Sequence, residues 1–295
     1  MLASLVILAA LTFFLLKVLP GGPFDADIAL NPLVKEKLNE HWQVERSWFV
    51  QAGSYLQGFV KGDLGVSMAR PERTVADIIG QGLANTLALN GLSLVFILAG
   101  SIFISVIAIR YRDSWIENTI DQSVIAFLSL PSLFWGPLLI YLFGFYWNLL
   151  PVAFLSSPAH YILPLLTLSL RPLASLVRLL KNSLNENFHQ DYVRTAKAKG
   201  VGTWRILIHH VLKNSLIPFL SYVGPLIVSL LSGSFLVEVL FAVPGLGTEF
   251  ISALNERDYT LIMGLTLFYG TLLIIVNSLI DVLLKFVDPR LREEA

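Results

Sequence analysis

Six long apolar stretches alternate with polar segments along the chain. They are Leu2–Leu19, Leu83–Ile109, Ile120–Trp147, Tyr161–Leu180, Leu216–Val243 and Leu261–Phe286. Each is close to or longer than the roughly 20 residues that a helix needs to cross the hydrocarbon of a bilayer. A helix satisfies all of its own backbone polar groups, which lipid cannot do. The pattern therefore predicts an all-α membrane protein with six transmembrane helices in one domain over residues 1–295.

The composition agrees with this pattern. Hydrophobic residues make up 55% of the chain and charged residues 14%, whereas soluble domains average about 25% charged residues. The net charge is zero, so there is no electrostatic case for nucleic acid as a partner. Cysteine is absent, which excludes disulfides, thiolate metal sites and a cysteine nucleophile.

Sequence motifs for catalysis are absent as well. The chain contains no Gly-Lys dipeptide and therefore no phosphate-binding P-loop. If ATP drives this protein, another chain must bind it. There is also no H-E-x-x-H zinc motif, no G-x-S-x-G nucleophile motif and no helical Glu-x-x-His pair. We expect a non-catalytic chain with no cofactor and no metal site of its own.

The first apolar stretch, residues 1–19, has two interpretations. Only Lys17 interrupts it, and a lysine near the end of a span can reach the interface. A cleaved signal peptide is the alternative. The stretch has no basic region before it and no small-residue cleavage site after it, which favours a membrane span.

A long polar segment, residues 24–81, follows the first stretch, and we expect it to lie outside the cell membrane. Aromatic and apolar residues recur there at helical spacing, which predicts an amphipathic helix. They are Trp48, Phe49, Ala52, Leu56 and Phe59. A turn is expected at Gly62–Gly65, and Pro71 is expected to open another short helix. The segment is either a folded loop with no role of its own or a lip that helps to seat a delivering protein.

Residues 185–215 form a second polar segment, between the fourth and fifth apolar stretches. Its first half, Asp191–Lys199, has acids at its start and bases at its end, the order that a helix macrodipole favours. Gly200 stands where a left-handed residue would end that helix. Thr203 has the position of an N-cap for a second helix. The apolar stripe of that helix would be Trp204, Leu207, Ile208 and Val211.

This second segment resembles the coupling-loop motif of ABC importer permeases, Glu-Ala-Ala, three residues, Gly. Gly200 aligns with the glycine, and Arg194, Thr195 and Ala196 fall on the leading positions, where only Ala196 matches. His210 and Lys213 replace the isoleucine and proline expected further on. The match is closer to the peptide-permease branch, whose members read R-T-A-x-A-K-G. A basic, solvated cytoplasmic loop is the alternative interpretation.

Other short motifs resemble the same family in the same order. They are LPGGP (19–23), GDLGVS (62–67), ANTL (84–87), the VE before PGLG (244–247), RDY (257–259) and DPRLR (288–292). The resemblance implies a permease of the dipeptide, oligopeptide and nickel branch. It further implies a bacterial inner-membrane location, with translocation of peptides delivered by an extracytoplasmic binding protein.

The resemblance also implies partners and contact residues. The partners would be a second, homologous permease subunit, two cytosolic ATPases that bind ATP and magnesium, the binding protein and membrane lipid. The ATPase-coupling residues would be Asp191, Tyr192, Arg194, Thr195, Ala196, Lys197, Ala198, Lys199 and Gly200. Nickel or glutathione is the alternative substrate within the family. A secondary transporter or a channel is the alternative from another class.

Basic residues predict the orientation, because they accumulate in cytoplasmic loops. With both termini inside, the inner loops and tail hold Arg110, Arg112, Arg178, Lys181, Arg194, Lys197, Lys199, Arg205, Lys213, Lys285, Arg290 and Arg292. The two short outer loops hold only Arg257. The coupling loop would then lie in the cytosol.

Two further groups of polar residues are candidates for function. An external gate or binding-protein contact would comprise Glu238, Pro244, Gly245, Gly247, Arg257 and Asp258. We expect Glu238 to reach the interface without full desolvation. Arg171 lies inside the fourth apolar stretch, where charges are costly and usually functional. Its alternative is a side chain that snorkels to the cytosolic interface.

Overall fold

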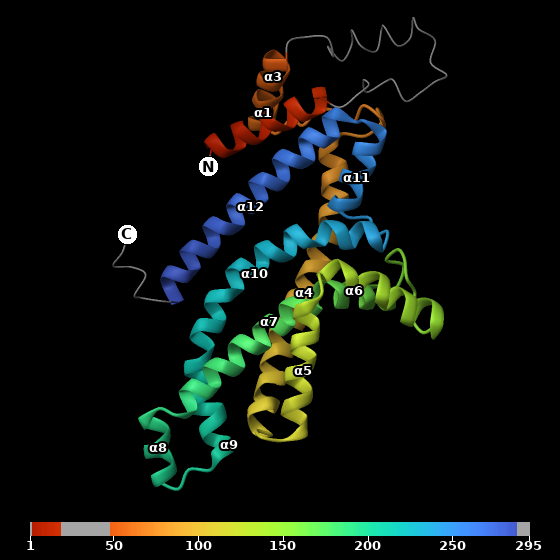
Figure 1. Ribbon diagram of the computed structural model, residues 1–295. Coiled ribbons are helices and arrows are strands. Elements are labelled where there is room, and N and C mark those ends of the chain that lie inside the picture. The colour runs from red at the N-terminus through yellow and green to blue at the C-terminus, as the bar shows by residue number, and fades with distance from the viewer. Residues whose placement is uncertain (1, 19–47, 288–295) are drawn as a thin grey trace, which may run out of the picture. The chain divides into compact units, whose positions relative to one another are not determined.

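The computed structural model describes residues 2–18 and 48–287. Two compact units are present, and each joins two separate parts of the chain (Figure 1). Unit 1 comprises residues 1–86 and 244–275, and unit 2 comprises residues 87–243 and 276–295. The predicted motifs at 19–23 and 288–292, and most of the external segment before residue 48, lie outside the described residues.

The described residues are helical apart from turns, irregular loops and one isolated β-bridge between Val66 and Thr74. The α-helices are α1 (Leu2–Val18), α3 (Trp48–Val60), α4 (Val75–Arg110), α5 (Trp115–Ser129), α6 (Ser132–Leu139), α7 (Ile162–Phe188), α8 (Asp191–Ala198), α9 (Thr203–Ile206), α10 (Leu212–Leu240), α11 (Leu246–Glu256) and α12 (Tyr259–Val287). Two π-helical segments, Ile140–Tyr146 and Leu207–Val211, and one 3₁₀ turn, Pro158–Tyr161, complete the set.

Four described helices are long and apolar enough to cross a membrane. They cover Val75–Arg110, Pro158–Phe188, Thr203–Leu240 and Tyr259–Ile280. A fifth candidate is the bent pair Trp115–Ser129 and Ser132–Tyr146, and α1 is apolar but only 17 residues long. An all-α membrane fold is thus confirmed, while the number six stays a prediction.

The third predicted span, 120–147, is broken rather than merely kinked. Its two helices meet at 104°. The break falls at Leu130, which is extended with φ −105° and ψ 144°. Proline disfavours the helical conformation of the residue before it, and Pro131 follows Leu130. Pro137 lies inside α6 and does not end it.

The prediction that Pro71 opens a short helix is wrong. The chain forms turns there, and one continuous helix of 36 residues, α4, follows. The Thr74 hydroxyl accepts a hydrogen bond from the Asp77 amide at 3.1 Å. The Thr74 hydroxyl also lies 2.6 Å from the Asp77 carboxylate. A side chain that satisfies a free amide in the first turn starts a helix at this point. The pattern Thr-x-x-Asp was the available signal.

Unit 1 closes around an apolar cluster from α1, α4, α11 and α12. Its fully buried members include Ala9, Val75, Leu246, Ala253 and Leu261. Gly264 of α12 allows α4 to pack closely, because a Cβ at this position would lie 2.4 Å from the Val75 side chain. The predicted amphipathic helix is present as α3, and its Leu56 and Phe59 pack against this cluster.

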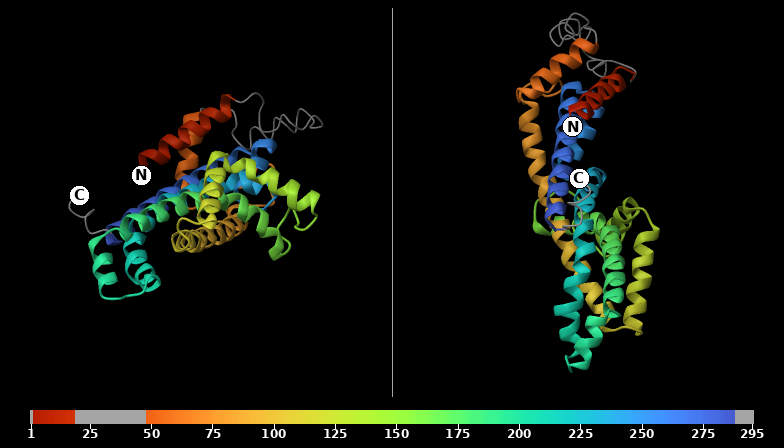
Figure 2. Two further views of the ribbon diagram at one scale, coloured as in Figure 1. Left: turned by 60° about the horizontal axis from the view of Figure 1, so that its bottom comes forward. Right: turned by 90° about the vertical axis from the view of Figure 1, so that its left-hand side faces the viewer.

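Unit 2 is organised around α7. Its buried leucines include Leu163, Leu176, Leu180 and Leu184, all with 0% exposure. α7 packs against α10, α5 and α6, and it runs beside α10 in each view (Figure 1 and Figure 2). Gly224 of α10 lies against α12, since a Cβ there would meet Ile280 at 2.2 Å. Small residues allow such close approach between membrane helices.

Candidate functional site

The helix predicted at 191–199 is present as α8, Asp191–Ala198. One face of α8 packs against unit 2, with Val193 fully buried and Tyr192 and Ala196 partly buried. Ala196 therefore lies on the partly buried side of the helix. Arg194, Thr195, Lys197, Ala198 and Lys199 are exposed.

Gly200 ends α8 in the way that the sequence predicts. Its φ is +75°, the left-handed region that costs a residue with a Cβ roughly 1–2 kcal/mol. The Gly200 amide donates to the Lys197 carbonyl at 2.9 Å, and the Val201 amide donates to the Ala196 carbonyl at 3.1 Å. This pair of bonds is a Schellman motif, which satisfies the last carbonyls of the helix. The turn direction is thereby set by backbone hydrogen bonds.

The second helix differs in detail from the prediction. Gly202, and not Thr203, is the N-cap of α9. The five residues Leu207–Val211 are π-helical and continue into α10. A π-helical turn holds extra residues and so shifts the faces of a helix. Leu207 and Val211 of the predicted stripe are buried, as is Ile206, whereas Trp204 is 53% exposed.

Asn187, in the last turn of α7, joins three helices. Its amide nitrogen donates to the Ser183 carbonyl of α7 at 2.9 Å and to the Ser215 hydroxyl of α10 at 3.1 Å. Its amide oxygen accepts a hydrogen bond from the Tyr192 hydroxyl of α8 at 3.1 Å. One amide side chain therefore ties α8 to both of the long helices that flank it.

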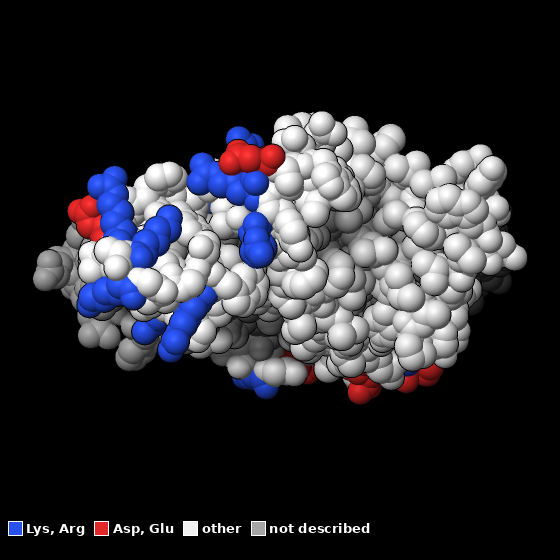
Figure 3. Space-filling view, turned by 90° about the horizontal axis from the view of Figure 1, so that it is seen from below, with Lys and Arg blue, Asp and Glu red and all other residues white. Residues whose placement is uncertain are grey.

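The exposed end of unit 2 around α8 is basic. Figure 3 shows Lys and Arg side chains gathered over this end. The sequence places Arg194, Lys197, Lys199, Arg205 and Lys213 there, and all five are exposed. Beside them, a cleft of about 410 Å³ is lined by Arg110, Phe188, Trp204 and neighbouring residues. Positive charge, the exposed Trp204 ring and this cleft therefore lie together at the solvent-exposed end of unit 2.

The residues predicted for an external gate fall in different parts of the structure. Glu238 belongs to unit 2, and Pro244, Gly245, Gly247, Arg257 and Asp258 belong to unit 1. Glu238 has 0% exposure, so the expectation that it reaches the interface without full desolvation is wrong. Gly245 is the N-cap of α11, a helix that lies between the predicted fifth and sixth spans.

Asp258 has an internal role in unit 1. Its carboxylate accepts hydrogen bonds from the Ser67 hydroxyl and from the amides of Ala69 (3.2 Å) and Leu261 (2.9 Å). The bond from Leu261 caps the start of α12. Asp258 is fully buried. Its charge thus holds the 67–69 segment and α12 together and is not offered to a partner.

Two nearby groups brace the same part of unit 1. The Arg70 guanidinium lies 2.9 Å from Glu249 and 3.7 Å from Glu256, both on α11. The Tyr55 hydroxyl lies 3.2 Å from the Leu64 carbonyl and 3.1 Å from the Thr260 carbonyl. Burial raises the pKa of the Tyr55 phenol well above its usual range, and the negative charges of Asp258 and Asp63 raise it further. Tyr55 therefore remains a hydrogen-bond donor.

Comparisons with known proteins bear on the whole chain. The family model described as "Binding-protein-dependent transport system inner membrane component" matches residues 75–293. The dipeptide transport system permease protein DppB of Bacillus subtilis is 34% identical, with 99% of this chain and 95% of the relative covered. The oligopeptide transport system permease protein OppB of Haemophilus influenzae is 30% identical, with 99% and 96% covered.

This chain belongs to the family of binding-protein-dependent transport system inner membrane components.

Solved structures agree with the fold. An inward-facing MetNI methionine ABC transporter aligns with a TM-score of 0.58 at 17% identity, covering 72% of this chain and 96% of that one. An amino acid ABC transporter aligns with a TM-score of 0.56 at 15% identity, covering 71% and 94%. The suspected resemblance is therefore confirmed, and the chain is a non-catalytic permease component of an ABC importer.

Sequence reasoning missed two residues of this permease that support the α8 helix, Asn187 and Ser215. Each is a short polar residue at the edge of an apolar helix, a pattern shared with many solvent-facing positions. Only their contacts across α7, α8 and α10 distinguish them.

Tyr192→Phe tests the support of α8. The variant leaves the Asn187 amide oxygen without the phenol donor, and a hydrogen bond of this kind contributes about 0.5–1.5 kcal/mol. We expect an assembled transporter with reduced uptake and raised ATP hydrolysis per substrate transported. The measurement is the ratio of substrate uptake to ATP hydrolysis in proteoliposomes.

Tyr111→Phe is the matched control, because it removes the same phenol hydroxyl from a residue that is 47% exposed and lies outside α8. An unchanged ratio for Tyr192→Phe would contradict a mechanical role for the Asn187 contacts.

Proposed function

We propose that this permease forms part of the pathway by which peptides cross the inner membrane. An extracytoplasmic binding protein delivers the peptide, a second homologous permease subunit completes the pathway, and two cytosolic ATPases bind ATP and magnesium. Support for peptides comes from the relatives, which are named as dipeptide and oligopeptide permease proteins. Nickel and glutathione remain the alternative substrates.

Coupling to the ATPases is assigned to α8 and Gly200. The observation that carries this assignment is the combination of an exposed basic face on α8 with a firmly held inner face. The helix is short, its end is set by the Schellman bonds at Gly200, and the contacts of Asn187 tie it to α7 and α10. A push on the exposed face is therefore passed to two long helices and is not absorbed in a soft loop.

The proposed cycle uses this helix as a lever. Closure of the ATPase pair around ATP moves the two permease subunits' levers and opens the pathway outward. Hydrolysis and release reset it. ATP can drive this change only because it binds the closed ATPase pair more tightly than the open one.

The orientation required by this proposal places α8 in the cytosol, together with both termini of six spans. The chain contains no native cysteine, so single cysteines can be labelled cleanly. Ala198 of α8 and Glu72 of unit 1 are both exposed. An impermeant maleimide should label Glu72→Cys in intact cells and Ala198→Cys only after permeabilisation. The opposite pattern would overturn the orientation.

Gly200→Val tests the lever. A β-branched side chain in the left-handed region is strained by more than the roughly 1–2 kcal/mol of an ordinary residue. A Cβ at Gly200 would meet no atom within 4 Å, so the strain is purely conformational. We expect normal insertion, loss of uptake, and either loss of the ATPases on purification or ATP hydrolysis that ignores the binding protein.

Gly202→Val provides the matched control for the lever. This position also has open space around a Cβ, but its φ is −62°, which valine adopts without strain. Uptake should be retained. Equal activity of the two variants would leave α8 as a solvated basic loop.

The substrate class is tested with the full importer in proteoliposomes. A labelled alanine tripeptide, loaded on the binding protein, should accumulate inside in an ATP-dependent way. Reduced glutathione and nickel ions serve as competing substrates. Accumulation of nickel or glutathione without peptide would overturn the assignment to peptides and leave the family assignment intact.

A further inference from the structure

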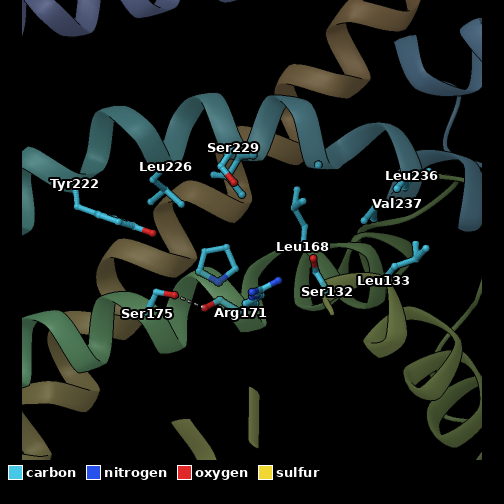
Figure 4. A pocket seen from close by; sticks show the side chains of 13 residues that line it. Ser132, Leu133, Leu168, Arg171, Ser175, Tyr222, Leu226, Ser229, Leu236 and Val237 are labelled. Carbon is cyan, nitrogen blue, oxygen red and sulfur yellow. Dashed lines mark hydrogen bonds between the residues drawn. The ribbon is translucent and has the colours of Figure 1, made fainter. Parts of the chain in front are cut away.

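A cavity of about 370 Å³ lies within unit 2, between α6, α7 and α10 (Figure 4). Its size falls within the range of small-molecule pockets, about 300–1,000 Å³. Eight of its 13 lining residues are apolar, and the polar side chains are Ser132, Arg171, Ser175, Tyr222 and Ser229. Figure 4 shows Arg171 and Ser175 on α7, and the phenol of Tyr222 extending from α10 into the space between the two helices.

Arg171 is the charged residue of this cavity, and it lies deep in the span. It stands nine positions after Ile162 at the start of α7, which is about 14 Å at 1.5 Å per residue. The candidate span runs from Pro158 to Phe188, so Arg171 lies inside it and away from both of its ends. Arg178, two turns further along α7, is better placed to reach the cytosolic interface.

Lys181, a second cation of unit 2, has carboxylate partners within the protein. The Lys181 ammonium lies 2.7 Å from the Glu117 carboxylate and 2.7 Å from that of Asp121. In the part of the chain that the structure describes, no carboxylate forms an ion pair with Arg171, which is solvent-exposed along the cavity. A charge at membrane depth is costly unless water or a counter-charge accompanies it. Lys181 has internal counter-charges, whereas Arg171 is open to an external one.

We propose that Arg171 binds the free C-terminal carboxylate of the peptide during its passage through the membrane. A guanidinium presents parallel N–H donors that match the two oxygens of a carboxylate. Every unmodified peptide carries this group, whatever its side chains. Arg171 thus provides an attraction that does not select among sequences.

The rest of the cavity suits a peptide backbone. The hydroxyls of Ser132, Ser229 and Tyr222 can each donate and accept a hydrogen bond. Apolar residues such as Leu226 and Leu230 line the same space and impose no polar selection on side chains. This inference rests on the proposed peptide substrate and adds the group of the peptide that the permease recognises.

The test uses the complete importer with saturating loaded binding protein. Alanine tripeptide with a free carboxylate is compared with its C-terminal amide, for the wild-type permease and for Arg171→Gln. Loss of a charge-assisted contact should lower uptake of the free acid about tenfold or more. Uptake of the amide should change less than about twofold. The wild-type permease and the Arg171→Gln variant receive substrate from the same binding protein. Any preference of that protein for one peptide therefore affects both permeases equally.

Two further arms identify the source of the effect. Arg178→Gln is the matched control, an exposed arginine on the same helix outside the cavity, and should leave both substrates unchanged. An amidated peptide with an internal aspartate separates the two carboxylate sources. If Arg171→Gln impairs this amide but not the amide of plain alanine, the site also takes acidic side chains.

The outcomes are distinguishable. If wild type carries no amide at all, Arg171→Gln should bring the free acid down to the same level, and that result supports the proposal. Equal loss of both peptides, or no loss of either, overturns it and leaves peptide import standing. If wild type imports neither peptide, peptide import itself fails, and the role of Arg171 fails with it.

Discussion

The controlling constraint on this chain is that lipid offers no hydrogen-bond partner to the backbone. Each interruption of a helix must therefore be satisfied from within the protein. After the π-helical segment 140–146, the Trp147 amide bonds the Leu142 carbonyl at 2.9 Å, and the Leu149 amide bonds the Phe143 carbonyl at 2.8 Å. The end of α8 is satisfied by the Schellman pair. At these two points, backbone hydrogen bonds fix the bend.

The proposed coupling to the ATPases depends on bends that do not flex when α8 is pushed. The segment from Asn187 to Val211 changes direction several times, yet each change is held by a named contact. Asn187 joins α7, α8 and α10, Gly200 sets the turn, and the π-helical segment Leu207–Val211 re-aims the start of α10. A helix bonded to two long neighbours can move only together with them. This mechanical property links the exposed basic end of unit 2 to its cavity.

Several charged side chains have partners inside the protein, and this distinguishes them from Arg171. Lys181 has two carboxylates within 2.7 Å, Asp258 is enclosed by a hydroxyl and two amides, and Arg70 is paired with α11. For a mostly buried pair such as Lys181 and Glu117, removal of one partner leaves a poorly compensated charge, which is destabilising. Arg171 has no such arrangement among the described residues. Its charge is available for a molecule that passes.

The sequence by itself determined the all-α membrane class, the family and the position of the short helix α8. Apolar runs of span length have few alternatives in lipid, and a glycine after an Ala-rich basic helix has a strong left-handed preference. These are local properties, and each was visible in consecutive residues such as Ala196–Gly200.

Only the tertiary structure decided which side chains face inward and which polar groups meet. The helical period placed Trp204 in one apolar stripe with Leu207 and Val211, yet Trp204 is 53% exposed and Ile206 is buried. Glu238 reads as a helix-end charge and is fully enclosed. Asn187 and Ser215 are 28 residues apart, and no local pattern pairs them. Side-chain burial and long-range hydrogen bonds depend on how helices pack, and packing is a property of the whole unit and not of any one segment.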